Sequence, residues 1–157
     1  MTEIKKVAVV GAGVMGSAIA AHFANAGVPV LLLDIVPEGA RNRNTIAEAA
    51  VQRLLRGEPP AFMHSRAPSL IKPGNIVDHL DLLASVDWVV EAVSEDLNTK
   101  KDLYRRIEAV RRDGSVVTSN TSTLSLARLA EGMPGRFCGD FLITHFFNPP
   151  RYIRLLE

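Results

Sequence analysis

The chain has 157 residues, of which 47% are apolar and 22% are charged, and its net charge is +1. This composition is that of an ordinary globular protein, and the length is sufficient for one buried core. The nearly balanced charge excludes a nucleic-acid or membrane partner that is held by bulk charge. Cys138 is the only cysteine, so no intrachain disulfide forms, and a reduced, cytoplasmic setting fits best.

The N-terminal segment has some features of a signal peptide. Lys5 and Lys6 precede the apolar stretch "VAVVGAGVMGSAIAA", which ends in small residues. Three glycines interrupt this stretch, and a second apolar run, "VPVLLLD", follows that a cleaved signal would not need. Both features argue against export. Because no uninterrupted apolar run reaches about eighteen residues, no membrane span is predicted.

The first part of the chain is predicted to alternate strands and helices. Residues 5–10 and 28–34 are apolar runs typical of buried parallel strands. Residues 14–27 are rich in helix formers and end at a glycine, and residues 37–57 carry a proline in a plausible first turn of a helix. This order of strand, helix, strand and helix predicts the start of a doubly wound α/β fold.

The remainder continues the pattern after an interruption. Residues 57–75 hold four prolines and two glycines, which indicates a loop with a short helical piece. The elements expected after it are a strand at 76–80, a helix at 81–86, a strand at 87–93, a helix at 98–114, a strand at 115–122, a helix at 123–133, and strands at 141–147 and 152–157. The last two strands are joined by "NPPR" and are expected to form a C-terminal antiparallel hairpin beside a mostly parallel sheet.

A glycine-rich loop follows the first strand and opens the first helix. It has the pattern G-x-G-x-x-G at Gly11, Gly13 and Gly16, which is typical of Rossmann-type dinucleotide sites. The first glycine allows a tight turn, the second lets the backbone approach a pyrophosphate, and the third lets helix and strand pack closely. The helix N-terminus offers free N–H groups to the phosphates. The residues assigned to the cofactor in this loop are Gly11, Ala12, Gly13, Val14, Met15 and Gly16.

Asp34 ends the second strand at the position where dinucleotide sites carry an acid. Its carboxylate can accept hydrogen bonds from the adenosine ribose and would repel a 2′-phosphate, which favours NAD over NADP. A purely structural interpretation has the glycines form a tight turn and Asp34 cap the next helix. A flavin protein with the same glycine pattern is a further alternative.

Polar clusters lie at later strand ends, where an open parallel sheet faces its ligand crevice. They are "EAVSED" at 91–96, "SNTS" at 119–122, "THFFNPP" at 144–150 and the terminal Glu157. Taken singly, each has an ordinary interpretation. His145 could be a core histidine, Glu157 a solvated acid and "SNTS" a turn held by its own side chains.

Together these motifs resemble the NAD-binding domain of the L-3-hydroxyacyl-CoA dehydrogenases of fatty-acid β-oxidation. The matching pieces are "VAVVGAGVMGSAIA", "LLLD", "VVEAVSED", "SNTSTL" and "HFFNPP" followed by "LLE", and they span nearly the whole chain. "HFFNP" with a glutamate twelve residues after His145 is the most specific of them. The chain is most similar to the dehydrogenase part of multifunctional fatty-acid oxidation enzymes.

The resemblance implies a role for each of the distal residues. His145 matches the base that takes the hydroxyl proton while hydride passes to NAD, and a free imidazole titrates near neutral pH, as a general base requires. Glu157 matches the carboxylate that orients the imidazole and stabilises its charged form. Ser122 and Asn148 match residues beside the substrate oxygen and the nicotinamide ribose, and they are assigned to both the catalytic and the cofactor site. Glu95 and Lys100 match cofactor contacts, and no residue is assigned to a metal.

The resemblance also implies parts that these 157 residues lack. Members of the family continue into a helical domain that forms one wall of the cleft and the dimer interface, so residues 1–157 are expected to be a single NAD-binding domain. An acyl-CoA substrate and a homodimer are the implied partners. Two alternatives stay open: a dehydrogenase that acts on a free hydroxy acid, and an NAD-binding module without catalysis, against which the pair of His145 and Glu157 argues.

Overall fold

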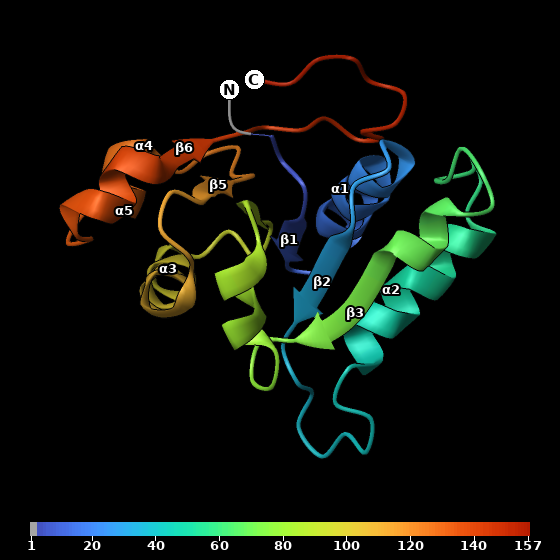
Figure 1. Cartoon of the computed structure of the whole chain (residues 1–157), viewed down its shortest axis with the longest axis horizontal. Helices are drawn as coiled ribbons and strands as arrows, with labels where there is room; N and C mark the ends of the chain where they lie inside the picture. The colour runs from blue at the N-terminus through green and yellow to red at the C-terminus, as the bar shows by residue number, and fades with distance from the viewer. Residues whose placement is uncertain (1–2) are drawn as a thin grey trace.

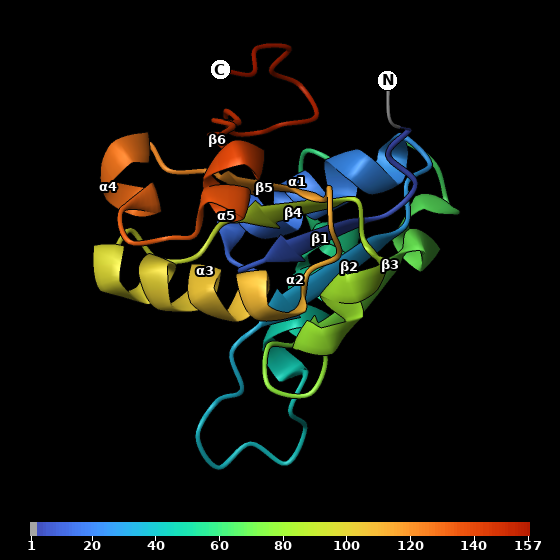
Figure 2. The same cartoon turned by 60° about the vertical axis from the view of Figure 1, so that its left-hand side comes forward.

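A six-stranded, entirely parallel sheet forms the centre of the molecule, and helices cover both of its faces (Figures 1 and 2). The computed structural model describes residues 3–157. The strands are β1 (Val7–Val10), β2 (Val30–Asp34), β3 (Ile71–Asn75), β4 (Trp88–Glu91), β5 (Val116–Ser119) and β6 (Phe141–Ile143). The helices are α1 (Val14–Asn25), α2 (Thr45–Arg56), α3 (Leu97–Val110), α4 (Leu126–Ala130) and α5 (Gly135–Asp140), with short 3-10 helices at Ala67–Leu70 (η1) and Leu80–Ser85 (η2).

The strand order is β3-β2-β1-β4-β5-β6, so the direction of winding reverses between β1 and β4. In such a sheet the loops that follow the two central strands diverge, and the crevice between them is the usual ligand site. The expected Rossmann-type doubly wound fold is therefore confirmed.

The apolar pattern of the strands explains why both faces are covered. Val7 and Val9 face a cluster that includes α1 and α2, whereas Ala8 and Val10 face a second cluster that includes α3, α4 and α5. All four residues of β1 are buried. Since successive side chains of a strand point to opposite faces, a continuous apolar run can only lie between two layers of helices.

The predicted strand at 76–80 is wrong. The third strand, β3, lies at 71–75, inside the proline-rich stretch that was interpreted as a loop, and η1 supplies the short helical piece expected there. β3 forms the edge of the sheet and pairs only with β2. An edge strand tolerates Pro73, because a proline that cannot donate a hydrogen bond does least harm where one side of the strand has no partner.

Two predictions near the C-terminus also need correction. The helix expected at 123–133 is confined to the five residues of α4, and α5 follows it as an element that the sequence pattern did not predict. The expected antiparallel hairpin is not part of the sheet, because β6 is short and parallel to β5, and residues 152–157 form no strand. The returning chain makes a single isolated antiparallel bridge, between Phe146 and Leu156.

Candidate dinucleotide and catalytic site

The first and third glycines of the loop lie where no larger residue fits. Gly11 has φ of +104°, which is strained for any residue with a side chain, and a Cβ there would lie 2.5 Å from the carbonyl oxygen of Ala92. A Cβ on Gly16 would lie 1.8 Å from the carbonyl oxygen of Gly11. The loop, the first turn of α1 and the end of β4 are therefore packed backbone to backbone.

Gly13 differs from the other two glycines of the motif, because a Cβ added there would meet nothing within 4 Å. It precedes Val14, the first residue of α1, and no side chain caps this helix end. The N–H groups of the first helical turn, to which Val14 and Met15 belong, point out of the helix end without partners inside it. An open approach, free N–H groups and a positive helix dipole together fit a bound phosphate group.

Asp34 lies at the end of β2 beside this loop. Its Oδ2 accepts a hydrogen bond from the N–H of Ala12, and its Oδ1 accepts one from the N–H of Ile35 at 2.7 Å. Each carboxylate oxygen keeps a second lone pair that a ribose hydroxyl can use. Helix α2 begins eleven residues later with Asn44 as its N-cap, so Asp34 does not cap the next helix.

A cavity of about 720 Å³ connects these features. Gly11, Gly13 and Asp34 line it on one side, and residues 92–94 with the first turns of α3 line the other. The cavity therefore lies between the ends of β1 and β4, where the winding reverses. Its size and position fit the adenosine and pyrophosphate parts of a dinucleotide.

Glu95 and Lys100 lie close together beyond the end of β4. The carboxylate of Glu95 accepts hydrogen bonds from the hydroxyls of Thr121 and Thr123 and lies 3.4 Å from the ammonium of Lys100. Burial alone would raise the pKa of Glu95, but the two threonines and the charge of Lys100 outweigh it and lower the pKa to about 2. Glu95 is therefore charged at neutral pH and holds the loop after β5.

Lys100 does not line the cavity. Only 1% of its side chain is exposed, and its ammonium lies 2.6 Å from the buried carboxylate of Glu91, at the end of β4. The sequence interpretation included Glu91 in the polar cluster at 91–96 but assigned it no role, and in the structure it also accepts hydrogen bonds from Tyr104 and Ser119. The available signal was an acid at the end of a wholly apolar strand, where a charge needs buried partners.

Ser122, His145 and Glu157 come together at the loop after β5. The Oγ of Ser122 lies 3.0 Å from Nε2 of His145, and Nδ1 of His145 lies 3.6 Å from a carboxylate oxygen of Glu157. The backbones of His145 and Glu157 exchange two hydrogen bonds, of 2.7 and 3.2 Å. This exchange places the two side chains next to each other on the same side of the paired segments. The three residues line a shallow hollow of about 360 Å³.

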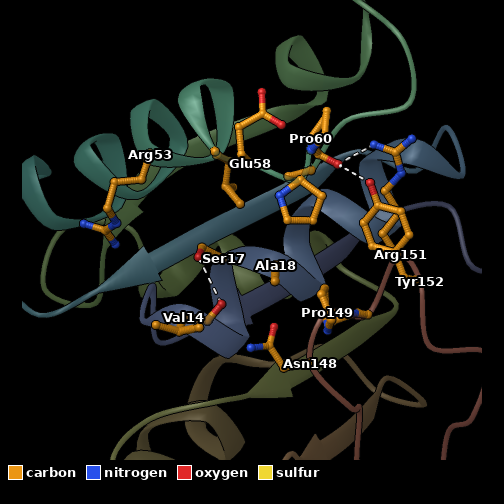
Figure 3. A pocket seen from close by; sticks show the side chains of 15 residues that line it. Val14, Ser17, Ala18, Arg53, Glu58, Pro60, Asn148, Pro149, Arg151 and Tyr152 are labelled. Atoms are coloured by element: carbon orange, nitrogen blue, oxygen red, sulfur yellow. Dashed lines mark hydrogen bonds between the residues drawn. The ribbon is translucent and has the colours of Figure 1, made fainter.

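Asn148 lies apart from this trio and lines a different hollow, of about 330 Å³, between α1 and residues 57–61 (Figure 3). Val14 and Ala18 of α1 form its floor, and Arg53 of α2 stands at one end. Arg151 closes the opposite end by donating hydrogen bonds to the backbone carbonyls of Pro60 and, at 2.9 Å, of Phe62. The lining is mostly apolar, and Val14 joins this hollow to the glycine loop.

Comparison with known proteins gives the family. Residues 6–157 match the model of the "3-hydroxyacyl-CoA dehydrogenase, NAD binding domain" family. The chain belongs to this family. Within the family the cofactor is NAD, which agrees with the geometry of the glycine loop and of Asp34.

Curated relatives and solved structures agree with this assignment. A Deinococcus radiodurans protein named "Probable 3-hydroxyacyl-CoA dehydrogenase" is 49% identical over 99% of this chain and 45% of its own length. The "Fatty acid oxidation complex subunit alpha" of Pseudomonas aeruginosa is 35% identical over 99% of this chain and 21% of its own. The 3-hydroxybutyryl-CoA dehydrogenase of Escherichia coli has a TM-score of 0.75 at 30% identity, over 99% of this chain and 32% of that one. The chain thus spans less than half the length of these relatives.

Two further observations concern the described residues as a whole. Within residues 3–157, no group of three or more His, Cys, Asp or Glu side chains is placed to hold a metal ion. Over the same residues, none of the helices combines the length and the apolar character that crossing a bilayer would require.

Proposed function

We propose that this chain is the NAD-binding part of a dehydrogenase that oxidises the 3-hydroxyl of an L-3-hydroxyacyl-CoA to a ketone. The observation that carries the proposal is the trio of Ser122, His145 and Glu157, which lies at the same edge of the sheet as the glycine loop. Bound NAD supplies the acceptor for the hydride that leaves C3. The residues of this chain supply the base, its orientation and the binding of the cofactor.

His145 is proposed to take the proton of the substrate hydroxyl at Nε2. Glu157 lies 3.6 Å from Nδ1, so it favours the tautomer with the proton on Nδ1 and leaves Nε2 free to accept. It also stabilises the positive charge that the ring gains in the reaction. Ser122 lies 3.0 Å from Nε2, so its hydroxyl can hold the substrate oxygen beside the base.

The cofactor contacts are proposed to run from the glycine loop to Asn148. Gly11 to Gly16 and Asp34 hold the pyrophosphate and the adenosine ribose, while Glu95 and Lys100 support the far end of the site near Ser122. Asn148 is proposed to contact the nicotinamide ribose, since it follows His145 by three residues on the same segment.

The acyl-CoA is proposed to use the hollow in Figure 3 for part of its chain. The hollow is mostly apolar, it lies beside Asn148, and Arg53 and Arg151 stand at its two ends. An apolar channel with cations at its ends suits a pantetheine chain that carries phosphates. A free hydroxy acid has no part that would fill such a channel, so the observation favours the thioester over the free acid.

Turnover is proposed to need a further, helical domain that closes the site and forms a homodimer, in a cytoplasmic protein. Positioning of the reacting atoms can account for roughly 7–11 kcal/mol of a barrier, and the hollow that holds His145 is open on this chain. The antiparallel pairing of residues 141–147 and 152–157 is proposed to extend beyond its single bridge when that domain packs against it.

The test is NADH formation by a protein that carries this chain together with its substrate-binding parts. L-3-hydroxybutyryl-CoA and free L-3-hydroxybutyrate are offered at equal concentrations with NAD. The proposal expects a kcat/KM for the thioester at least about a hundredfold above that for the free acid, because only the thioester fills the apolar hollow. Equal values for the two substrates would favour a free-acid dehydrogenase, and NAD binding without turnover of either would favour a non-catalytic module.

A further inference from the structure

A cluster of buried polar side chains lies beneath the candidate site, between β4, β5 and α3. Its members are Glu91, Lys100, Tyr104 and Ser119, and each is at most 1% exposed. We refer to these four residues as the Glu91 cluster. None of them lines the cavity beside the glycine loop. A direct contact with the cofactor therefore does not explain why a charge pair is buried here.

The carboxylate of Glu91 is the centre of this cluster. Oε1 accepts from the ammonium of Lys100 at 2.6 Å and from the N–H of Val93 at 2.8 Å. Oε2 accepts from the hydroxyls of Tyr104 at 2.6 Å and Ser119 at 2.7 Å. Burial and the neighbouring carboxylate of Glu91 both raise the pKa of Tyr104, so its hydroxyl stays a donor. The bond from Val93 is local, whereas the three side-chain bonds join Glu91 at the end of β4 to α3 and β5.

Stability alone is a weak reason for such a cluster. Taking two charges out of water costs several kcal/mol for each ion, and well-packed apolar residues of similar volume are often as stabilising as a buried pair. A buried pair is better explained where it fixes the position of something else. In this chain the ammonium of Lys100 has a second carboxylate within reach, that of Glu95 at 3.4 Å.

Glu95 carries this link to the candidate catalytic loop. Its carboxylate accepts hydrogen bonds from the hydroxyl of Thr121 and from the hydroxyl and N–H of Thr123, the latter two at 2.9 and 3.3 Å. Ser122 lies between these two threonines and touches His145. On the other side, Ser119 ends β5 and begins the same loop. The loop of Ser122 is thus connected to Glu91 directly at Ser119 and, through Lys100 and Glu95, at the two threonines that flank Ser122.

We propose that Glu91 is a positioning residue that, through Lys100 with Glu95 and through Ser119, holds the hydroxyl of Ser122 against His145. The catalytic meaning of this contact rests on the proposed function, but the contact itself does not. Lys100 then acts by holding Glu95 in place, and its ammonium stays buried when the cofactor binds.

The first experiment observes His145 directly in the full chain by nitrogen–proton NMR of the histidine rings. The chain has four histidines, and His145→Gln identifies the signal of interest. We expect Glu91→Gln to move the ring signals of His145, because the Ser122 hydroxyl no longer meets Nε2. The signals of His22, His64 and His79 should stay in place, since the Glu91 cluster touches none of them.

A matched control comes from the other end of α3. The buried side chain of Arg111 pairs with Asp140 at 2.9 Å. Asp140 precedes β6 and Ser122 follows β5, so the two lie toward opposite ends of this pair of parallel strands. Asp140→Asn removes one carboxylate from a buried cation, as Glu91→Gln does. It should lower the melting temperature without moving the signals of His145. If the ring signals of His145 shift in both variants, a general loss of stability is the cause, and the proposal is overturned.

The second experiment covers the case in which Glu91→Gln does not fold. The double variant Glu91→Gln with Lys100→Met removes both charges, and such a replacement is often neutral for stability. If it folds and the signals of His145 still move, the cluster positions the loop. If it folds and the signals of His145 are unchanged, the cluster only stabilises the fold and the proposal is wrong.

Titration of the same variants with NADH and ADP-ribose separates this proposal from the proposed function. We expect Glu91→Gln to weaken the binding of NADH about fivefold, which is the order of one lost hydrogen bond. The affinity for ADP-ribose should stay within about twofold of the wild-type value. Equal weakening of both ligands would contradict a role at the nicotinamide end. Failure of the wild-type chain to bind either ligand would contradict the proposed function, while the NMR result on His145 would still decide the role of Glu91.

Discussion

The glycine loop and the C-terminal segment both contribute to the candidate site, but they are held in different ways. The loop lies between β1 and α1, and a Cβ on Gly11 or Gly16 would overlap backbone atoms. The segment from His145 to Glu157 lies outside the sheet, and one isolated bridge and two backbone hydrogen bonds pair its two ends with each other. Its hydrogen bonds to the rest of the chain are made by single groups, such as the N–H of Phe146 with Asn120 and the side chain of Arg151 with residues 60 and 62. It also exposes large apolar side chains, among them Ile153 at 42% and Leu155 at 56%.

From this difference we expect cofactor binding and the proposed chemistry to depend on different parts of the protein. The cofactor end is complete within the buried sheet, so its geometry is fixed by the fold. The candidate catalytic end lies outside the sheet and exposes apolar surface, so we expect its geometry to depend more on what packs against it. Four predictions test how far this separation holds.

The largest effect is expected from Gly16→Ala. A Cβ at this position would lie 1.8 Å from the carbonyl oxygen of Gly11, so α1 or the loop must move. We expect a loss of about 3 kcal/mol in the free energy of unfolding, together with loss of NAD binding. Chemical denaturation and calorimetric titration measure the two quantities.

Gly13→Ala is the matched control, because open space surrounds this position. Its free energy of unfolding should change by less than about 1 kcal/mol, while NAD binds at least about tenfold more weakly, since a methyl group blocks the approach of the pyrophosphate. If both variants lose the same stability, the rigid packing of the loop is not what distinguishes the two positions.

The next effect concerns the proposed base, His145. In a protein that carries this chain with its substrate-binding parts, His145→Gln should lower turnover about a hundredfold or more, the range for lost general-base help. Affinity for NAD should stay within about twofold, because the glycine loop does not depend on His145. Steady-state kinetics and a binding titration measure both. His64→Gln, at an exposed position away from Ser122, is the control and should leave turnover unchanged.

A tenfold effect is expected at Asp34. The wild-type chain should bind NAD at least about tenfold more tightly than NADP, or about 1.4 kcal/mol, because the carboxylate would repel a 2′-phosphate. Asp34→Asn should reduce this preference. Calorimetric titration of both proteins with both cofactors decides the matter. Equal affinity of the wild-type chain for NAD and NADP would remove the role assigned to Asp34.

The smallest effect concerns the dependence of stability on pH. The pKa of Glu95 is lowered from an ordinary value of 4.5 to about 2, so its charged form stabilises the folded chain. This contribution is complete above about pH 4.5 and is lost as the pH falls toward 2. Glu95→Gln should therefore flatten the fall in melting temperature between about pH 5 and about pH 3. Glu38→Gln changes an exposed acid in the loop after β2 and should leave the curve unchanged. An equal flattening in both variants would show that the loss of any acidic charge, and not the contacts of Glu95, causes the effect.

Much of the fold could be predicted, because its signals are local. The apolar runs of β1, β2 and β4 and the glycine that follows β1 are features of single segments, and they give the order of elements and the doubly wound class. The position of β3 could not be predicted in the same way. Whether a segment with Pro73 can be a strand depends on its having an open edge, which is a property of the assembled sheet.

The candidate site shows the same division between features that local sequence specifies and contacts that only the assembled fold creates. The sequence alone determined the glycine loop, the acid at Asp34 and the residue types of "HFFNPP", because each follows from local backbone needs or from a specific motif. Only the tertiary structure decided that Lys100 turns inward to Glu91 and that Glu95 attaches to the loop of Ser122. These contacts join side chains from different strands and helices. A buried charge takes whichever partner the packed elements bring within reach, and no local pattern of residues specifies that distance.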